Sequence, residues 1–246
     1  YSNYNITHDD PQHSSKKNIK PHLSEYYKIP PKENAQFVAN MEDILAVYKL
    51  PYNPDVPVIC MDESPKQLIE EIHKPLPTKE GKVKKIDPEY KRNGVANIFM
   101  AVEPLGGRRY VKATEHRCKT DWAIFMKNLS ELYPDASKII IVMDNLNTHT
   151  TGSFYEAFPP SEARKLSTKF EFHYTPKHGS WLNIAESELS VLVRQCLNQR
   201  IPTLHEIQRL ITIWQNNRNN KHAKVNWQFT IDDARIKLQS LYPKFE

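Results

Sequence analysis

The chain has 246 residues, of which 39% are hydrophobic, and it carries a formal net charge of +5. This length fits one large domain, or a domain with extensions, and the excess of positive charge favours an anionic partner. Only three cysteines occur and none forms a C-x-x-C pair, which argues against a zinc knuckle or a disulfide framework. No apolar run approaches the ~20 residues of a membrane span and no segment resembles a signal peptide, so we expect a cytoplasmic protein without a membrane partner.

The segment 1–34 is polar and shows little periodicity, with Pro30 and Pro31 close to its end. This composition predicts an arm or linker at 1–34, ahead of a folded domain at 35–246. The chain also starts without methionine, which suggests a fragment or a product cut from something longer.

The first regular elements follow from the spacing of apolar residues. Such residues recur at helical spacing over 34–49, which predicts a helix, and a proline-containing break then leads into a strand at about 56–62. The segment 63–94 is charged and contains proline, which favours a solvated loop over a basic surface along DNA.

Two apolar runs around Gly106 and Gly107 predict a β-hairpin with strands at 97–102 and 109–113. The remaining expected elements are, in chain order, a helix over 121–133 with Thr120 as its N-cap, a strand over 138–144, a short helix near 151–158, a strand over 170–174, and helices over 182–198, 204–217 and 232–241.

The order of these elements is strand, hairpin, helix, strand, helix, strand, helix. This is the order of the ribonuclease H-like fold, an α/β architecture in which a mixed five-stranded sheet has helices on both faces. The last helices would be C-terminal additions to it. By analogy with that fold, the strands that end at Asp62 and Asp144 are expected to lie side by side.

Three acidic residues occupy distinctive positions in this pattern. Asp62 ends the apolar run 58–61, Asp144 ends the run 139–143, and Glu186 lies at the start of a helical pattern. A carboxylate at the end of a buried strand is costly unless a cation or a hydrogen-bond donor satisfies it. Together the three predict an oxygen-ligand site for divalent metal, as in two-metal phosphoryl-transfer enzymes.

Two of these acids have an acidic neighbour that competes for the same role. Adjacent residues of a strand face opposite ways, so only one of Asp62 and Glu63 points at the site, and the other is expected to contact solvent or a basic residue. Glu186 competes with Glu188, which is about 200° away around the helix. Asn183 shares a helix face with Glu186, and this polar patch favours Glu186. We therefore expect Glu188→Gln to be tolerated.

Further polar residues stand close to these acids in the sequence. Asn145 fits a role in anchoring a loop or orienting a phosphate. His149 fits a contact with DNA or a metal-bound water, although a loop histidine more often faces solvent. Lys177 and His178 fit phosphate neutralisation, whereas Trp181 is equally suited to stack on a base or to fill the core. The candidate DNA contacts are Asn145, His149, Lys177, His178, Trp181, Asn183, Arg92, Lys84 and Lys85.

Three blocks of the sequence resemble the DDE transposases of the Tc/mariner superfamily, and most closely their bacterial insertion-sequence branch. The resemblance extends over about residues 30–242, and the blocks occur in the expected order and spacing. The blocks are Met61–Ser64, Val142–His149 and Tyr174–Glu186, and the segments Arg92–Asn97 and Phe229–Arg235 also look like that branch.

The resemblance implies that Asp62, Asp144 and Glu186 are a catalytic triad that holds two Mg²⁺ ions, for which Mn²⁺ can substitute. It implies hydrolysis at the ends of a mobile DNA element and transfer of the freed 3′-OH into target DNA, typically at a TA dinucleotide. The implied partners are terminal inverted repeats, target DNA and a second copy of the chain, because two element ends must be joined. The implied location is the bacterial cytoplasm, at the nucleoid.

Members of this superfamily normally carry helix-turn-helix domains ahead of the catalytic domain, whereas here only the polar arm precedes it. We therefore expect salt-sensitive, weakly specific DNA binding by this chain alone. Two other interpretations stay open. One is a catalytically idle derivative that binds DNA or pairs with an active subunit, against which the intact triad argues. The other is a ribonuclease H-like nuclease without strand transfer, which the transposase blocks fit less well.

Overall fold

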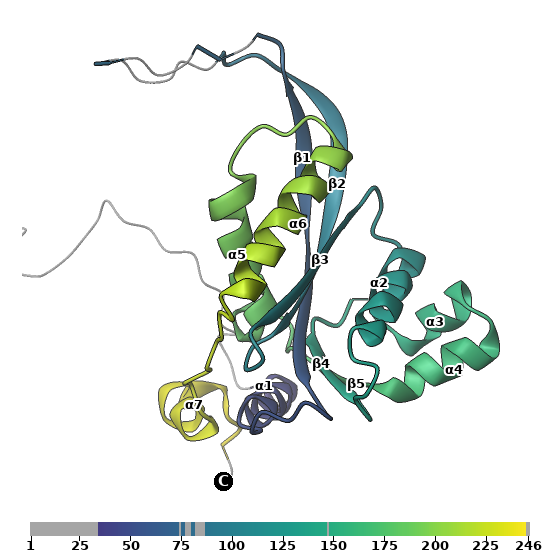
Figure 1. Ribbon diagram of the computed structural model, residues 1–246. Helices are drawn as coiled ribbons and strands as arrows, with labels where there is room; N and C mark the ends of the chain where they lie inside the picture. Colours follow the sequence, from purple (N-terminus) through teal and green to yellow (C-terminus); the bar gives the residue numbers. More distant parts are fainter. Residues whose placement is uncertain (1–33, 74, 77–79, 82–86, 147, 245–246) are drawn as a thin grey trace, which may run out of the picture.

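The described part of the chain forms one five-stranded sheet in the order β3-β2-β1-β4-β5, with helices on both faces (Figure 1). β1, β2 and β3 are antiparallel, whereas β1, β4 and β5 are parallel. The predicted α/β fold with a mixed five-stranded sheet is confirmed. The arm predicted at 1–34 lies outside the described residues, except for Asn34, the N-cap of the first helix. This computed structural model describes residues 34–73, 75–76, 80–81, 87–146 and 148–244.

The element bounds agree with most of the predicted ones. The strands are β1 (Val58–Glu71), β2 (Tyr90–Glu103), β3 (Arg108–Thr114), β4 (Ile139–Met143) and β5 (Phe170–Tyr174). The α-helices are α1 (Ala35–Tyr48), α2 (Lys119–Glu131), α3 (Thr151–Ala157), α4 (Pro160–Lys169), α5 (Ile184–Leu192), α6 (Leu204–Asn220) and α7 (Ile231–Lys237). Short 3₁₀ turns at Ser180–Leu182 and Gln239–Leu241 and a π-helical turn at Val193–Leu197 complete the set.

The strand that bears Asp62 is longer than the sequence predicts. β1 continues through Asp62 to Glu71 and stays paired with β2. The two ends of the segment predicted as a loop at 63–94 are therefore strands. They form a two-stranded ribbon that projects from the sheet (Figure 1). The apolar run nevertheless ends at Asp62, because the parallel pairing of β1 with β4 stops at Cys60↔Val142 and the strand is no longer buried between two neighbours.

Two helix predictions also differ from the structure. α2 begins one residue before Thr120, and its N-cap is Cys118. No element is predicted over 160–169, where the structure has α4. Pro160 occupies the first turn of α4, where proline is tolerated, and only Ala163 and Leu166 of this helix are buried, so its apolar signal is weak. Within the described residues, no helix is both long and apolar enough to cross a membrane.

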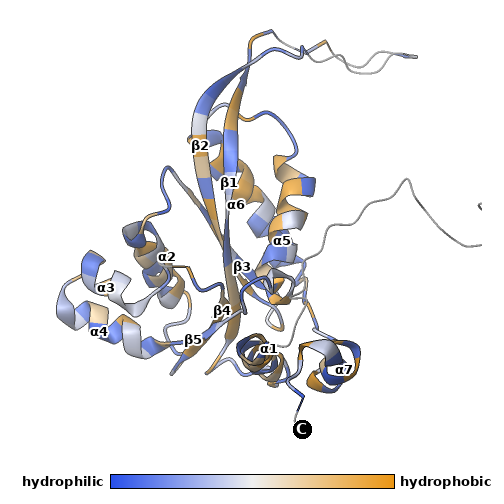
Figure 2. Ribbon diagram, turned by 180° about the vertical axis from the view of Figure 1, so that it is seen from behind, coloured by the Kyte–Doolittle hydropathy of each residue, from blue (hydrophilic) through white to orange (hydrophobic). Residues whose placement is uncertain are grey.

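Alternate residues of the central strands are buried in two separate clusters. Cys60 and Val142 belong to the cluster under α1, α5 and α6, whereas Met61 and Ile141 belong to the cluster under α2, α3 and α4. Figure 2 shows these two helix layers from behind. β4 is therefore covered on both faces, which is why it reads as a continuous apolar run and not as an alternating one.

Amide side chains of α6 cover the free edge of β3. A sheet edge exposes unpaired N–H and C=O groups, which invite pairing with another chain unless they are satisfied. Side chains from one face of α6 bond to alternate residues of β3 and replace the missing strand. The contacts are Asn219 with the N–H and C=O groups of Arg109 (2.8 and 2.9 Å), Gln215 Oε1 with the N–H of Val111 (2.6 Å) and Gln208 Nε2 with the C=O of Ala113 (3.0 Å).

A buried ion cluster joins β3, α5 and α6 behind the sheet. The carboxylate of Glu188 accepts hydrogen bonds from Arg109 Nε at 3.1 Å and from Arg218 Nη2 at 2.7 Å. Arg109 is 1% exposed and Glu188 4% exposed. Glu188 therefore points into the core and not toward Asp62. The expectation that Glu188→Gln keeps activity stays a prediction, but we now expect a cost in stability, because the substitution leaves two guanidinium groups without a counter-charge.

We expect Glu188→Gln to lower the free energy of unfolding by about 3 kcal/mol, the cost of breaking a buried ion pair on one side. Urea denaturation followed by circular dichroism measures this change. Glu206→Gln is the control, because the ion pair of Glu206 with Arg209 is largely exposed and is worth less than about 1 kcal/mol. Equal unfolding midpoints for the two variants would contradict the assignment of Glu188 to a stabilising cluster.

Candidate active site

The strands that carry Asp62 and Asp144 lie side by side, as the fold analogy predicts. β1 and β4 pair in parallel as far as Cys60↔Val142. Asp62 lies two residues after Cys60, and Asp144 lies two residues after Val142. Because side chains alternate along both strands, the two aspartates leave the sheet at the same end and in step with each other.

The third acid reaches this end of the sheet from α5, which packs on β1 and β2 (Figure 1). Glu186 lies in the first turn of α5 and is exposed. A carboxylate in that turn is favoured by the partial positive charge of the helix N-terminus. Asn183 is the N-cap of α5, and its side-chain oxygen accepts from the N–H of Ala185 at 3.1 Å.

Asp144 and Glu186 lie close enough to Asp62 to affect its ionisation. The pKa of Asp62 is raised from 3.8 to about 7, chiefly by burial of its carboxyl group and also by the negative charges of Asp144, Glu186 and Glu63, whereas a hydrogen bond from the N–H of Glu63 lowers it. Like charges that meet in one place favour the protonated form of one of them.

Glu63 faces the opposite side of β1 from Asp62, as alternation predicts. Its carboxylate lies 3.0 Å from His149 Nε2 and 3.6 Å from the guanidinium of Arg117. His149 is fully buried and stacks on Trp122, with ring centroids 5.7 Å apart. Glu63 therefore contacts basic residues on the α2 side, and Asp62 is the member of the pair that faces the other acids.

His149 also contacts Asp144, so that it bridges the two strands. Its Nδ1 lies 2.8 Å from Asp144 Oδ1 and 3.3 Å from the Asp144 backbone oxygen. Burial lowers the pKa of His149, but the contacts with Asp144 and Glu63 outweigh burial and raise it to about 9. The imidazole is therefore a buried cation between two carboxylates, which differs from the solvent-facing loop histidine that is common in sequences.

The three acids provide the carboxylate oxygens that a divalent cation binds, but they do not form a complete coordination site. Asp144 Oδ1 is buried and accepts no well-aligned hydrogen bond, although His149 lies close to it. Such an oxygen, beside Asp62 and Glu186, suits a hard cation that binds carboxylate oxygens. Among the residues that the structure describes, no three His, Cys, Asp or Glu side chains are already gathered tightly enough to hold a metal ion.

Four of the candidate DNA contacts are solvent-exposed near the acids. Asn145 follows Asp144, and Lys177, His178 and Trp181 lie in the turn before α5. Trp181 is 39% exposed and makes an edge contact with Phe229, so one face of its indole ring meets the protein.

The turn itself is tight. His178 has a φ of +67°, and a Cβ on Gly179 would lie 2.5 Å from Pro176, so only glycine fits there.

The remaining candidate DNA contacts are not exposed beside the three acids. His149 and Asn183 are buried and bonded within the protein, which leaves neither side chain free to contact DNA. Arg92 is exposed on the ribbon beside Tyr90, roughly 20 Å along β1 from Asp62 at the ordinary rise of a strand. Lys84 and Lys85 lie outside the described residues.

The model of a family described as DDE superfamily endonuclease matches residues 57–208, a span that includes all three acids. No curated protein matches the chain.

Solved structures of similar fold include the Mos1 mariner paired end complex with Mn, with a TM-score of 0.54 and 13% identity, covering 90% of this chain and 68% of that one. The Mos1 strand transfer complex has a TM-score of 0.54 and 13% identity, over 82% of this chain and 60% of that one. The Mos1 paired end complex with Mg has a TM-score of 0.52 and 12% identity, over 92% and 69%. At such low identity the likeness concerns the fold.

We expect Glu63 and His149 to be strongly coupled. A double-mutant cycle of Glu63→Gln and His149→Asn, measured by urea unfolding, should give a coupling free energy of about 1–3 kcal/mol, because both side chains are buried. The matched control is the half-exposed pair Lys127–Glu162, for which the same cycle should give less than about 1 kcal/mol. Equal coupling in the two cycles would contradict the role of His149 as a buried bridge.

Proposed function

The chain belongs to the DDE superfamily of endonucleases, and from this premise we propose that it is the catalytic domain of a DNA transposase. The proposed reaction is metal-dependent hydrolysis of a phosphodiester at the end of a mobile DNA element, followed by attack of the freed 3′-OH on target DNA. The proposed catalytic residues are Asp62, Asp144 and Glu186.

The observation that carries this proposal is the convergence of the three acids at one end of the sheet. Asp62 and Asp144 come from adjacent parallel strands, and Glu186 comes from the first turn of a helix packed on the same strands. The raised pKa of Asp62, caused by burial and then by the charges of Asp144 and Glu186, supports their proximity. The fold alone would not support it, because one fold hosts many functions.

Asp62, Asp144 and Glu186 would hold the divalent ions, which we propose are two Mg²⁺ or Mn²⁺ ions. When bound, such ions stabilise the attacking and the leaving oxygen of an in-line displacement. Other parts of the chain fix the positions of these carboxylates. His149 contacts Asp144 on the face of the sheet covered by α2, and α5 carries Glu186 on the opposite face. Two of the similar structures were solved as complexes with Mn and with Mg, which supports this choice of ions.

DNA would approach the exposed side of the acids. The exposed Lys177 and His178 stand before α5, where they are placed to neutralise phosphates, and Asn145 follows Asp144 on the same side. The net charge of +5 favours the same partner. Phosphate contacts of this kind make binding depend steeply on salt concentration.

The finer features of the proposal come from the sequence blocks around the acids. They support membership of the bacterial insertion-sequence branch of the Tc/mariner superfamily, insertion at TA, and action in the cytoplasm at the nucleoid. The Mos1 structures include a paired end complex and a strand transfer complex. We propose that this chain likewise acts as a dimer on two element ends.

The decisive experiment incubates the protein with a pre-cleaved, 3′-OH-ended oligonucleotide and a TA-containing plasmid in Mg²⁺ or Mn²⁺. We expect joined product in either metal, and none with Asp144→Asn or in EDTA. Nicked plasmid without joined product would instead indicate a nuclease that lacks strand transfer. DNA binding without cleavage or joining would indicate an idle derivative.

We expect Asp62→Asn and Glu186→Gln each to reduce metal-dependent strand cleavage on the order of 100-fold or more, because each removes charge that stabilises the reacting centre. DNA affinity, measured by fluorescence anisotropy, should stay within about twofold of the unsubstituted protein. Glu206→Gln is the matched control, since Glu206 also lies in the first turn of a helix but is bonded to Arg209. Full cleavage by Glu186→Gln would refute the role of Glu186.

A further inference from the structure

Asn183 makes one more hydrogen bond than a helix cap requires. Its side-chain oxygen caps α5 through the N–H of Ala185. Its side-chain nitrogen donates to the backbone oxygen of Met61 at 2.9 Å, in the strand and directly before Asp62. Asn183 is 3% exposed, so both bonds are made out of contact with water. One buried amide thus joins the residue before one acid to the turn that carries another.

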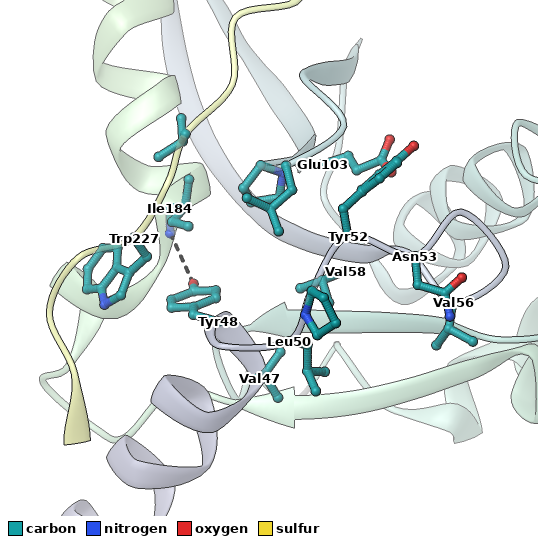
Figure 3. A pocket seen from close by; sticks show the side chains of 14 residues that line it. Val47, Tyr48, Leu50, Tyr52, Asn53, Val56, Val58, Glu103, Ile184 and Trp227 are labelled. Atoms are coloured by element: carbon teal, nitrogen blue, oxygen red, sulfur yellow. Dashed lines mark hydrogen bonds between the residues drawn. The ribbon is translucent and has the colours of Figure 1, made fainter. Parts of the chain in front are cut away.

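Tyr48 holds the same turn from the end of α1. Its hydroxyl donates to the backbone oxygen of Leu182 at 2.6 Å, and the N–H of Ile184 points at that hydroxyl from 3.5 Å. Figure 3 shows Tyr48 beneath Ile184, with Trp227 beside it. The Tyr48 and Trp227 rings pack with centroids 5.2 Å apart. The backbone on both sides of Asn183 is therefore fixed by one phenol group.

These contacts act against the repulsion between the acids. Asp62, Asp144 and Glu186 carry like charges at one end of the sheet, so Coulomb repulsion opposes their close approach. Repulsion of this sign pushes the first turn of α5 away from β1, because α5 carries Glu186. The bond from Asn183 to Met61 crosses the gap along which that separation would occur. The hydrogen bond from Tyr48 to Leu182 holds the turn before α5, so that this turn does not unwind in response to the repulsion.

We propose that Asn183 and Tyr48 form a positioning clamp, which holds the first turn of α5, and with it Glu186, against the end of β1 that carries Asp62. Neither side chain touches DNA or metal in this role. The inference rests on the proposed metal-dependent function and adds two residues that serve it indirectly. It also replaces the expectation that Asn183 contacts DNA.

The alternative is that Asn183 serves only as a helix cap and Tyr48 only as a core residue. The two roles of Asn183 are separable by substitution. Serine is as good an N-cap as asparagine, but its hydroxyl is too short to reach Met61 while it caps the helix. Asn183→Ser therefore keeps the cap and removes the cross-link. Tyr48→Phe keeps the packed ring and removes the hydroxyl.

The test measures Mn²⁺ binding to the full chain without DNA, by electron paramagnetic resonance of free Mn²⁺, with Asp62→Asn defining the non-specific background. We expect Asn183→Ser and Tyr48→Phe each to weaken Mn²⁺ binding about 5-fold, the worth of one net hydrogen bond. In the cleavage assay, both should shift the half-saturating Mn²⁺ concentration upward by the same factor and regain activity at high Mn²⁺.

Tyr133→Phe is the matched control, because the Tyr133 hydroxyl donates to Glu103 at 3.1 Å, away from the acids. It should lower the thermal unfolding temperature about as much as Tyr48→Phe does while leaving Mn²⁺ binding unchanged. Unchanged Mn²⁺ binding in Asn183→Ser and Tyr48→Phe would overturn the clamp but leave the proposed function intact. Weakened binding in both would support the clamp even if the protein cleaved no DNA. Absence of specific Mn²⁺ binding by the unsubstituted chain would overturn the metal site and the clamp with it.

Discussion

Electrostatic repulsion between three carboxylates is the main constraint on the arrangement of this site. The fold places Asp62, Asp144 and Glu186 at one end of the sheet, where burial and mutual repulsion raise the pKa of Asp62 to about 7. Packing alone does not oppose this repulsion, because apolar contacts have no preferred direction. Hydrogen bonds and ion pairs, which do have a direction, hold the chain around the acids on both faces of β1. On one face His149 contacts Glu63, and on the other face Asn183 bonds to Met61.

Much of the fold was predictable because burial leaves a periodic trace in the sequence. β4 is covered on both faces and reads as an unbroken apolar run, which also marks where Asp144 must lie. β5 was also predicted with its observed bounds, because Phe170, Phe172 and Tyr174 alternate along it. The alternation of Asp62 and Glu63 predicted that one of them would contact solvent or a basic residue, and Glu63 contacts Arg117 and His149.

The features that the sequence did not predict depend on partners that lie far away in the chain. β1 continues past Asp62 because β2 pairs with it, and pairing leaves no periodic trace in a charged segment. His149 is buried only because Glu63 and Asp144 share its charge, and Glu188 only because Arg109 lies opposite. Asn183 is the buried N-cap of α5, and its bond to Met61 connects distant segments and has no local signal in the sequence.

The distance in sequence between the acids has a consequence for the order of assembly during synthesis. About half of the chain lies between Asp62 and Glu186, and the antiparallel strands β1, β2 and β3 can pair before α5 has left the ribosome. Contacts between such distant segments form late, because the intervening chain must be ordered before they are gained. An unfinished chain would therefore carry a partial sheet with two of its three acids. The proposed cleavage of DNA, which needs all three acids, would therefore begin only when synthesis is well advanced, and incomplete chains would lack it.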